Sequence, residues 1–466
     1  MGANTTGAQN VAVGQNSLQT NTTGNYNTAV GQAALKDNTA SNNTAVGMKA
    51  LFENTTASDN TAVGYNALLN NTTGETNTAV GAYALDANVT HTNNTAIGYA
   101  VLSAATADGN TGVGDKVMQV STTGSANTGV GQQALRLNTT GTYNSALGSS
   151  ALTNNTTGNS NTASGYAALY SNTTGQTNTA FGRDALYFNT TGDGNTAIGN
   201  EALENNTASN NTAVGHHALT GNTTGIQNTA VGGGALIANT GGNYNTAVGY
   251  VAADAITTGQ YNTAVGRASL STNITGDSNT AVGYKALDQN TASLNTAVGS
   301  QALENNSTGT NNAALGEGAL KANTTGSHNV AMGYGALDAN TTGNQNTAIG
   351  KNALGANTTA GNNTAIGDRA LEANTTGTQN TALGKTSLQA NTTASYNTAA
   401  GSSALYSNTT GADNTAVGRT ALYANTTASN NTAVGAHALG ANTTGTQNVA
   451  VGGVTLSANT GGNYNT

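Results

Sequence analysis

The chain has 466 residues, of which only 7 % are charged and 4 % aromatic, and it contains no Pro, Cys or Trp. The lack of cysteine excludes a disulfide framework and thiolate metal sites. The net charge of −8 comes from scattered residues, so there is no basic patch for nucleic acid. No apolar run approaches the roughly 18 residues of a membrane-spanning helix. Nucleic acid is therefore not an expected partner, and no membrane insertion is expected within this segment.

One pentad, Asn-Thr-Ala-Val-Gly, recurs with mild variation from Asn10 to Asn465. It starts 28 times, and of the 27 intervals 23 are 17 residues long and four are 16. The unit from Asn60 to Thr76 shows the consensus, which is the pentad, two variable residues, Ala-Leu, two variable residues, Asn-Thr-Thr-Gly and two more variable residues. We number these positions 1 to 17 from the pentad Asn. The pattern predicts a single continuous array over residues 1–466, with both ends truncated in mid-repeat.

The variable positions separate exposed from hidden residues. With the gap of the 16-residue units placed at position 14, all 32 charged residues and all 17 tyrosines fall at positions 6, 7, 10, 11, 16 and 17. Charged side chains are almost never fully buried without a partner, so these six positions are expected to face solvent. The other eleven positions are expected to form the interior and the corners.

A unit of 17 residues is too short for a helical repeat of about 33 residues. Its two short segments, each followed by a turn signal, predict two strands and two turns per coil. The predicted fold is therefore all-β, a rod-shaped parallel β-solenoid of about 27 coils. Stacked strands lie about 4.8 Å apart, which predicts a length of about 130 Å. The asparagines at positions 1 and 12 are expected to form amide ladders, and the glycines at positions 5 and 15 to adopt positive φ.

The direction of the side chains in the first strand has two solutions. Val replaces Thr at position 2 in Asn10–Gly14 and Asn329–Gly333, which favours positions 2 and 4 pointing inward and Ala at position 3 pointing outward. An outer row of Ala, interrupted only by Gly112 and Gly129, would allow a second chain to approach closely, so we expect self-association as a homotrimer or filament. In the other solution the position-2 threonines form an outward ladder.

Parts of the array resemble known fibrous proteins. The pentads Asn10–Gly14 and Asn94–Gly98 are similar to the N-S/T-V-A-I-G repeats in the heads of trimeric autotransporter adhesins. The unit from Asn178 to Gly192 is similar to the Asn/Thr/Ala/Gly-rich repeats of bacterial and phage tail-fibre-like proteins. The resemblance covers essentially the whole chain. It implies a trimeric, left-handed parallel β-roll that is the shaft or head of a fibre on an extracellular, cell or virion surface.

Several local motifs match functional patterns but are explained by the repeat. Gly384-Lys385-Thr386 resembles the end of a phosphate-binding loop, yet the required upstream Gly is Gln379. His216 and His217 lie at variable positions with no further ligand nearby. We therefore expect no metal site and no cofactor.

Three further matches have the same explanation. Asp368 and Glu372 are positions 6 and 10 of one unit, and an uninterrupted array offers no cleft for paired carboxylates. The segment Met1 to Thr6 fits an N-myristoylation pattern but is in register with Leu439 to Thr444. Asn71-Thr72-Thr73 is formally an N-glycosylation acceptor, although this Asn is expected to be used in a corner ladder. No catalytic residue is predicted, and the protein is not expected to be an enzyme.

The leading hypothesis is a structural and adhesive extracellular fibre without catalysis. Exposed Tyr, Asn and Thr would make weak, repeated contacts with glycans or a host surface, and their number would convert weak binding into avidity. The alternative is an ice-binding β-solenoid with an exposed Thr ladder. It requires the position-2 threonines, or the Thr-Thr pair of the second turn, to lie outward at regular spacing. The Val substitutions interrupt the first row and the 16-residue units interrupt the second.

Overall fold

The structure is a computed structural model that describes residues 2–466, so Met1, with which the myristoylation pattern begins, lies outside the described residues. Within residues 2–466 the chain forms 27 strands of three residues each and no helix, and therefore no helix that could cross a membrane. The predicted parallel β-solenoid with a spacing of about 17 residues is confirmed. The chain divides into two units, Met1–Ala230 and Val231–Thr466, and each is described by itself.

Each strand covers positions 2 to 4 of its repeat. The strands of the first unit are β1 (Val11–Val13), β2 (Thr28–Val30), β3 (Thr44–Val46), β4 (Thr61–Val63), β5 (Thr78–Val80), β6 (Thr95–Ile97), β7 (Thr111–Val113), β8 (Thr128–Val130), β9 (Ser145–Leu147), β10 (Thr162–Ser164), β11 (Thr179–Phe181), β12 (Thr196–Ile198) and β13 (Thr212–Val214). Strand β14 (Thr229–Val231) includes residues of both units.

The second unit repeats the same arrangement. Its strands are β15 (Thr246–Val248), β16 (Thr263–Val265), β17 (Thr280–Val282), β18 (Thr296–Val298), β19 (Ala313–Leu315), β20 (Val330–Met332), β21 (Thr347–Ile349), β22 (Thr364–Ile366), β23 (Thr381–Leu383), β24 (Thr398–Ala400), β25 (Thr415–Val417), β26 (Thr432–Val434) and β27 (Val449–Val451).

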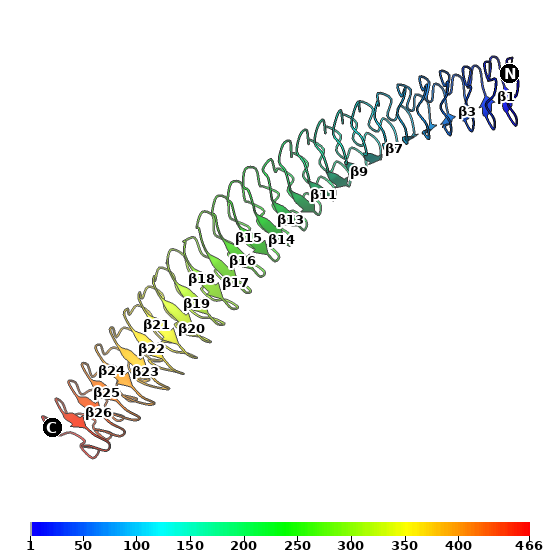
Figure 1. Cartoon of the computed structure of the whole chain (residues 1–466). Coiled ribbons are helices and arrows are strands. Elements are labelled where there is room, and N and C mark those ends of the chain that lie inside the picture. The colour runs from blue at the N-terminus through cyan, green and yellow to red at the C-terminus, as the bar shows by residue number, and fades with distance from the viewer. Residues whose placement is uncertain (1) are drawn as a thin grey trace. The chain divides into compact units, whose positions relative to one another are not determined.

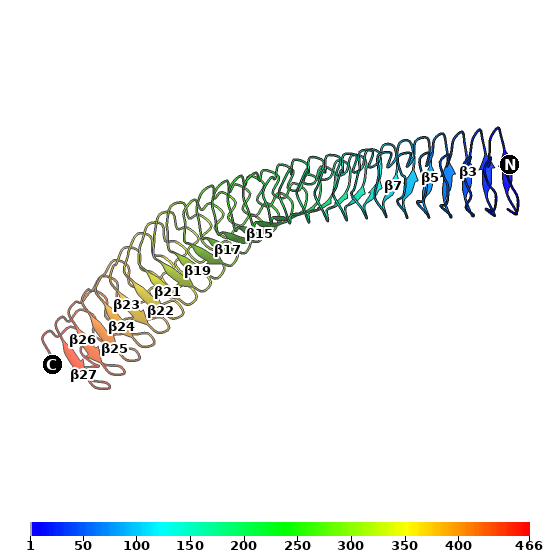
Figure 2. The ribbon, with the colours of Figure 1, turned by 45° about the horizontal axis from the view of Figure 1, so that its top comes forward.

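Consecutive strands within each unit pair in parallel, and every residue lies opposite the residue at the same position of the next coil. Thr61 faces Thr78 in the first unit, and Thr263 faces Thr280 in the second. The 16-residue coils keep this register, as the pairing of Thr196 with Thr212 shows. Figures 1 and 2 show the strands of each unit side by side on one side of the coils. Identical residues are therefore stacked in rows.

The prediction of a second strand in each coil is wrong. The segment around Ala-Leu forms turns in which alternate residues have positive φ, 58° at Lys49 and 52° at Leu51. It still connects neighbouring coils, because Leu51 N donates to Ala67 O at 3.0 Å and Lys49 N donates to Gln32 O at 2.9 Å in the coil on the other side. Alternating right- and left-handed residues thus direct N–H groups to both neighbours without an extended backbone.

The favoured side-chain direction in the strand is also wrong. The position-3 alanines point inward, and Ala62 and Ala281 are both 0 % exposed. Positions 2 and 4 point outward, so that Phe181 is 44 % and Ile198 42 % exposed. The core is formed by Ala at positions 3 and 8 and Leu at position 9. The interpretation of the Ala row as an outer contact surface is therefore overturned.

The two exceptions in the Ala row explain why only a small side chain fits at position 3. A Cβ atom added to Gly112 would lie 2.5 Å from Cγ1 of Val101, and one added to Gly129 would lie 2.7 Å from Cγ1 of Val117. Val101 and Val117 occupy position 8, which is Ala in most units. Glycine at position 3 therefore compensates for the larger residue that it faces across the thin coil.

The predicted Asn ladders are confirmed at both corners. Asn71 Nδ2 donates to Oδ1 of Asn54 in the preceding coil and to Gly74 O, each at 2.9 Å. At position 1 the backbone N of Asn77 donates to Asn60 Oδ1 at 2.9 Å. These hydrogen bonds satisfy polar groups of asparagines that are fully buried. The formal glycosylation acceptor Asn71 is therefore engaged inside the corner.

Glycine is required at positions 5 and 15 for different reasons. Gly249 at position 5 has φ of +141°, as predicted, and an added Cβ would lie 2.5 Å from Gly266 O in the next coil. The prediction of positive φ at position 15 is wrong. Gly175 at that position is needed instead because the backbones approach closely, and its added Cβ would lie 2.6 Å from Gly192 O.

Candidate functional surfaces

Each coil offers two surfaces on which function could depend. We define the strand face as the side chains at positions 2 and 4 of the strands, and the turn face as those at positions 6, 7, 10 and 11. The prediction that charged positions face solvent largely holds, since most charged residues are exposed or half-buried. The prediction that the remaining positions are interior fails on the strand face, which is outward although no charged residue occurs on it.

The strand face consists of one row of Thr and one row of aliphatic or aromatic side chains. Because side chains alternate along a strand, burying the central Ala turns both neighbours outward. Leu147 is 57 % exposed and Phe181 44 %. Between them Ser164 shortens the row and leaves a hollow of about 370 Å³ on the outer surface. An uncharged apolar row of this length is a feature that soluble proteins generally use for interactions.

The turn face carries tyrosines that stack from coil to coil. Tyr170 and Tyr187 have parallel rings with centroids 5.1 Å apart, and the rings of Tyr406 and Tyr423 are 5.2 Å apart. Partial burial, followed by the neighbouring Tyr170, raises the pKa of Tyr187. The exposed tyrosines predicted for contact are thus partly occupied with one another.

Some of the charges on the turn face are paired with one another. Lys285 Nζ lies 3.5 Å from Asp288 and 3.6 Å from Glu304, and Lys321 lies 3.6 Å from the same Glu304. Asp288 raises the pKa of Lys285, consistent with a stabilised ammonium. This group forms an ion network within the face.

The histidine pair and the phosphate-loop-like motif of the sequence have ordinary surroundings in the structure. The rings of His216 and His217 are nearly perpendicular with centroids 3.8 Å apart, and His217 Nδ1 lies 3.3 Å from Glu201. Among residues 2–466, no three His, Cys, Asp or Glu side chains come close enough together to hold a metal ion. Gly384 of the loop-like motif is a position-5 turn glycine with φ of +130°.

Asp368 and Glu372, the two acids of one coil, have different surroundings. Glu372 accepts a hydrogen bond from Gln389 Nε2 at 2.7 Å and lines a shallow hollow of about 340 Å³ together with Asp338. Asp368 does not line that hollow. Partial burial raises the pKa of Asp338. The pair Asp368 and Glu372 is therefore not brought together around one substrate position.

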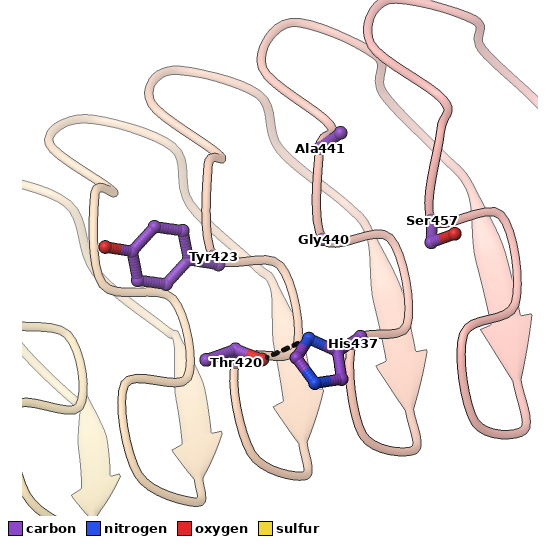
Figure 3. A pocket seen from close by; sticks show the side chains of 6 residues that line it. All are labelled: Thr420, Tyr423, His437, Gly440, Ala441 and Ser457. Carbon is purple, nitrogen blue, oxygen red and sulfur yellow. Dashed lines mark hydrogen bonds between the residues drawn. The ribbon is translucent and has the colours of Figure 1, made fainter.

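A second hollow, of about 420 Å³, lies on the turn face of the second unit (Figure 3). It is lined by Thr420, Tyr423, His437, Gly440, Ala441 and Ser457. Sequence reasoning missed it, although a signal existed: position 10 reads Tyr, Tyr, Gly, Ser in four consecutive coils ending at Ser457. The loss of a side chain beside two large ones predicts a gap.

Comparisons with known proteins give no further identification. No protein-family model matches the chain, and no curated protein is similar to it. The class established by the structure is that of parallel β-solenoids, and function is argued from the two faces.

Proposed function

We propose that this chain is a structural and adhesive segment of an extracellular fibre, on a cell or virion surface, without a catalytic role. Its copies associate as a homotrimer or filament through the strand face, and the turn face provides contacts to glycans or a host surface. The observation that carries the proposal is the strand face itself, which is exposed, apolar and free of charge in both units.

Exposure and composition together support this choice of surface. Exposed positions normally collect charged residues, and the turn face does so with Glu53, Arg267 and Lys351, which are all exposed. The strand face instead has exposed aliphatic residues such as Leu383, which is 40 % exposed. The centres of protein interfaces are depleted in charge in the same way.

The available area is sufficient for an interface. A three-residue strand is about 10 Å long and neighbouring strands are about 4.8 Å apart. The 13 strands β1–β13 therefore present about 600 Å² on one partner. Stable interfaces bury about 800 Å² per partner, and about 1,000 Å² in total is a practical minimum. Two such faces, one from each partner, would together bury about 1,200 Å², which exceeds this minimum.

Sedimentation of the full chain over a range of concentrations tests the proposal. We expect concentration-dependent assembly, which the double variant Phe181→Glu, Ile198→Glu abolishes because it places charges within the apolar row. Asn200→Glu adds a charge at position 6 of the same coil as Ile198 and serves as the matched control that still assembles. A wild-type chain that remains monomeric at all concentrations would overturn the proposal.

The outward Thr row favours one alternative function, ice binding. In the second unit Thr263 and Thr280 face each other in register, and in the first unit Thr196 faces Thr212 across a 16-residue coil. Regularly spaced hydroxyl and methyl groups on a flat surface could order water into a lattice. Thermal hysteresis measured on the wild type and on Thr263→Lys, Thr280→Lys separates this function from fibre assembly. Hysteresis that the variant loses would favour ice binding, and its absence at high concentration would exclude it.

A further inference from the structure

We propose that the hollow beside Tyr423 is a subsite for one pyranose ring of a saccharide. The inference rests on the proposed adhesive function and names a contact site for it on the turn face. It depends on three features of the hollow, which are a missing side chain, an aromatic wall and a fixed set of polar groups.

The missing side chain is at Gly440. Position 10 is occupied by Tyr406 and Tyr423 in two consecutive coils, by Gly440 in the next and by Ser457 in the one after that. Figure 3 shows Tyr423, Gly440 and Ser457 on three successive coils, with no side chain at Gly440 and with Ala441 next to it. The volume of about 420 Å³ is within the usual range of small-molecule sites.

The aromatic wall is the ring of Tyr423. This side chain is 41 % exposed, and on its other side it stacks with Tyr406 at an interplanar angle of 8°. The stacking holds the ring in place, so little side-chain entropy is lost on binding. A pyranose presents an apolar C–H surface that fits an aromatic ring, and the Tyr hydroxyl offers a hydrogen bond at its edge.

The polar wall is a closed chain of hydrogen bonds around His437. Thr420 Oγ1 donates to Arg419 O at 2.8 Å, so its lone pairs accept from His437 Nδ1–H, also at 2.8 Å. Arg419 Nη2 donates to His437 Nε2 at 2.8 Å. With these partners Nδ1 is the donor of the imidazole and Nε2 the acceptor. Figure 3 shows the Thr420–His437 contact at the base of the hollow.

The arrangement suits hydroxyl groups. Of the lining residues, Thr420 Oγ1 keeps a lone pair that can accept a hydrogen bond, and the Ser457 hydroxyl can both donate and accept. A ring with several hydroxyl groups and one apolar face matches this combination of walls. Binding of a single ring in so open a site is expected in the millimolar range, about −4 kcal/mol, and it becomes useful through many copies.

The test is NMR of the full chain with a panel of methyl pyranosides, those of mannose, galactose and N-acetylglucosamine. The chain has only five histidines, so the His437 Hε1 signal reports on this site. We expect at least one pyranoside to give saturation transfer and a saturable shift of His437. Gly440→Tyr, which continues the Tyr row into the gap, should reduce the effect at least tenfold.

Two controls keep the result specific. Gly355→Tyr introduces the same side chain at position 10 of another coil and should leave binding unchanged. Tyr423→Ser should also lose binding, whereas Tyr187→Ser, in the equivalent stacked pair, should retain it. Retention of the signal in Gly440→Tyr, or no transfer with any pyranoside, would overturn this inference. A chain that assembles normally in sedimentation but binds no pyranoside would refute the subsite and leave fibre assembly standing.

Discussion

The strand face and the turn face are both exposed, yet their residues differ in kind. The turn face holds Lys, Glu, Asp and Tyr in changing order, while the strand face keeps Thr and an aliphatic residue in coil after coil. Solvent exposure therefore does not explain why charge is missing from the strand face. The comparison teaches that two different requirements act on this thin coil. One is the need for a buried Ala core, and the other, which the proposed assembly would explain, is the need for an outer surface without charge.

The largest effect is expected at the glycine that joins the two faces. Gly249→Val would place a branched side chain at φ of +141° and against Gly266 O. We predict a loss of about 3–5 kcal/mol in the free energy of unfolding, measured by urea denaturation. Gly355→Ala, at a glycine without positive φ, should change stability by less than about 0.5 kcal/mol. Equal effects at the two sites would contradict the account of position 5.

Truncations on the inner and outer sides of one coil should differ. Leu203 is 0 % and Ile198 42 % exposed. Leu203→Ala should cost about 2–4 kcal/mol, because it leaves a cavity in the core. Ile198→Ala should cost about 1 kcal/mol or less and should weaken self-association instead. Comparing urea midpoints with sedimentation profiles for the two variants checks both parts. A larger loss of stability for Ile198→Ala would show that the orientation is wrong.

The fit between positions 3 and 8 can be tested by a double-mutant cycle. Gly112→Ala adds a methyl group against Val101 and should cost about 1–3 kcal/mol. Combined with Val101→Ala, the same substitution should cost little, since the core then has its common Ala-Ala pair. We expect a coupling free energy of at least about 1 kcal/mol. Additive effects would mean that the two side chains do not compete for space.

The smallest predicted change in stability concerns two half-buried acids on the turn face. Burial raises the pKa of Asp86 and of Asp254 above the ordinary value. Their contribution to stability is therefore full below the unfolded-state pKa and is lost as the pH rises through the folded-state pKa. Asp86→Asn, Asp254→Asn should be more stable than the wild type at pH 7, and the difference should shrink toward pH 4. Urea midpoints across this pH range measure it, and a difference that grows on acidification would contradict the sign.

Much of the fold could be predicted because the repeat itself encodes it. The period, the parallel stacking and the Asn ladders follow from spacing and from the positions that never carry charge. The turn segment could not be predicted, because Leu51 and its equivalents adopt a left-handed conformation that a Leu seldom takes. Here coil-to-coil hydrogen bonds and the burial of Leu outweigh that cost.

The strand orientation was predictable in principle. Gly112 and Gly129 occur in coils next to Val101 and Val117, and this size compensation identifies position 3 as interior. The Val substitutions at position 2 favour the opposite orientation, but Val11 and Val449 are in fact exposed on the outer surface. The hollow at Tyr423 depends on the exact path of four neighbouring coils, and sequence alone shows only the missing side chain at Gly440.

Thiol labelling of single-cysteine variants tests the central claim most directly, because the chain has no cysteine of its own. Thr280→Cys, Ala281→Cys and Val282→Cys are compared in strand β17, with Ser300→Cys at position 6 as the turn-face control. At low concentration we predict rapid labelling at residues 280, 282 and 300 and protection at 281. At high concentration residues 280 and 282 should become protected while residue 300 stays reactive. Rapid labelling at residue 281, or labelling at 280 and 282 that never depends on concentration, would contradict the account.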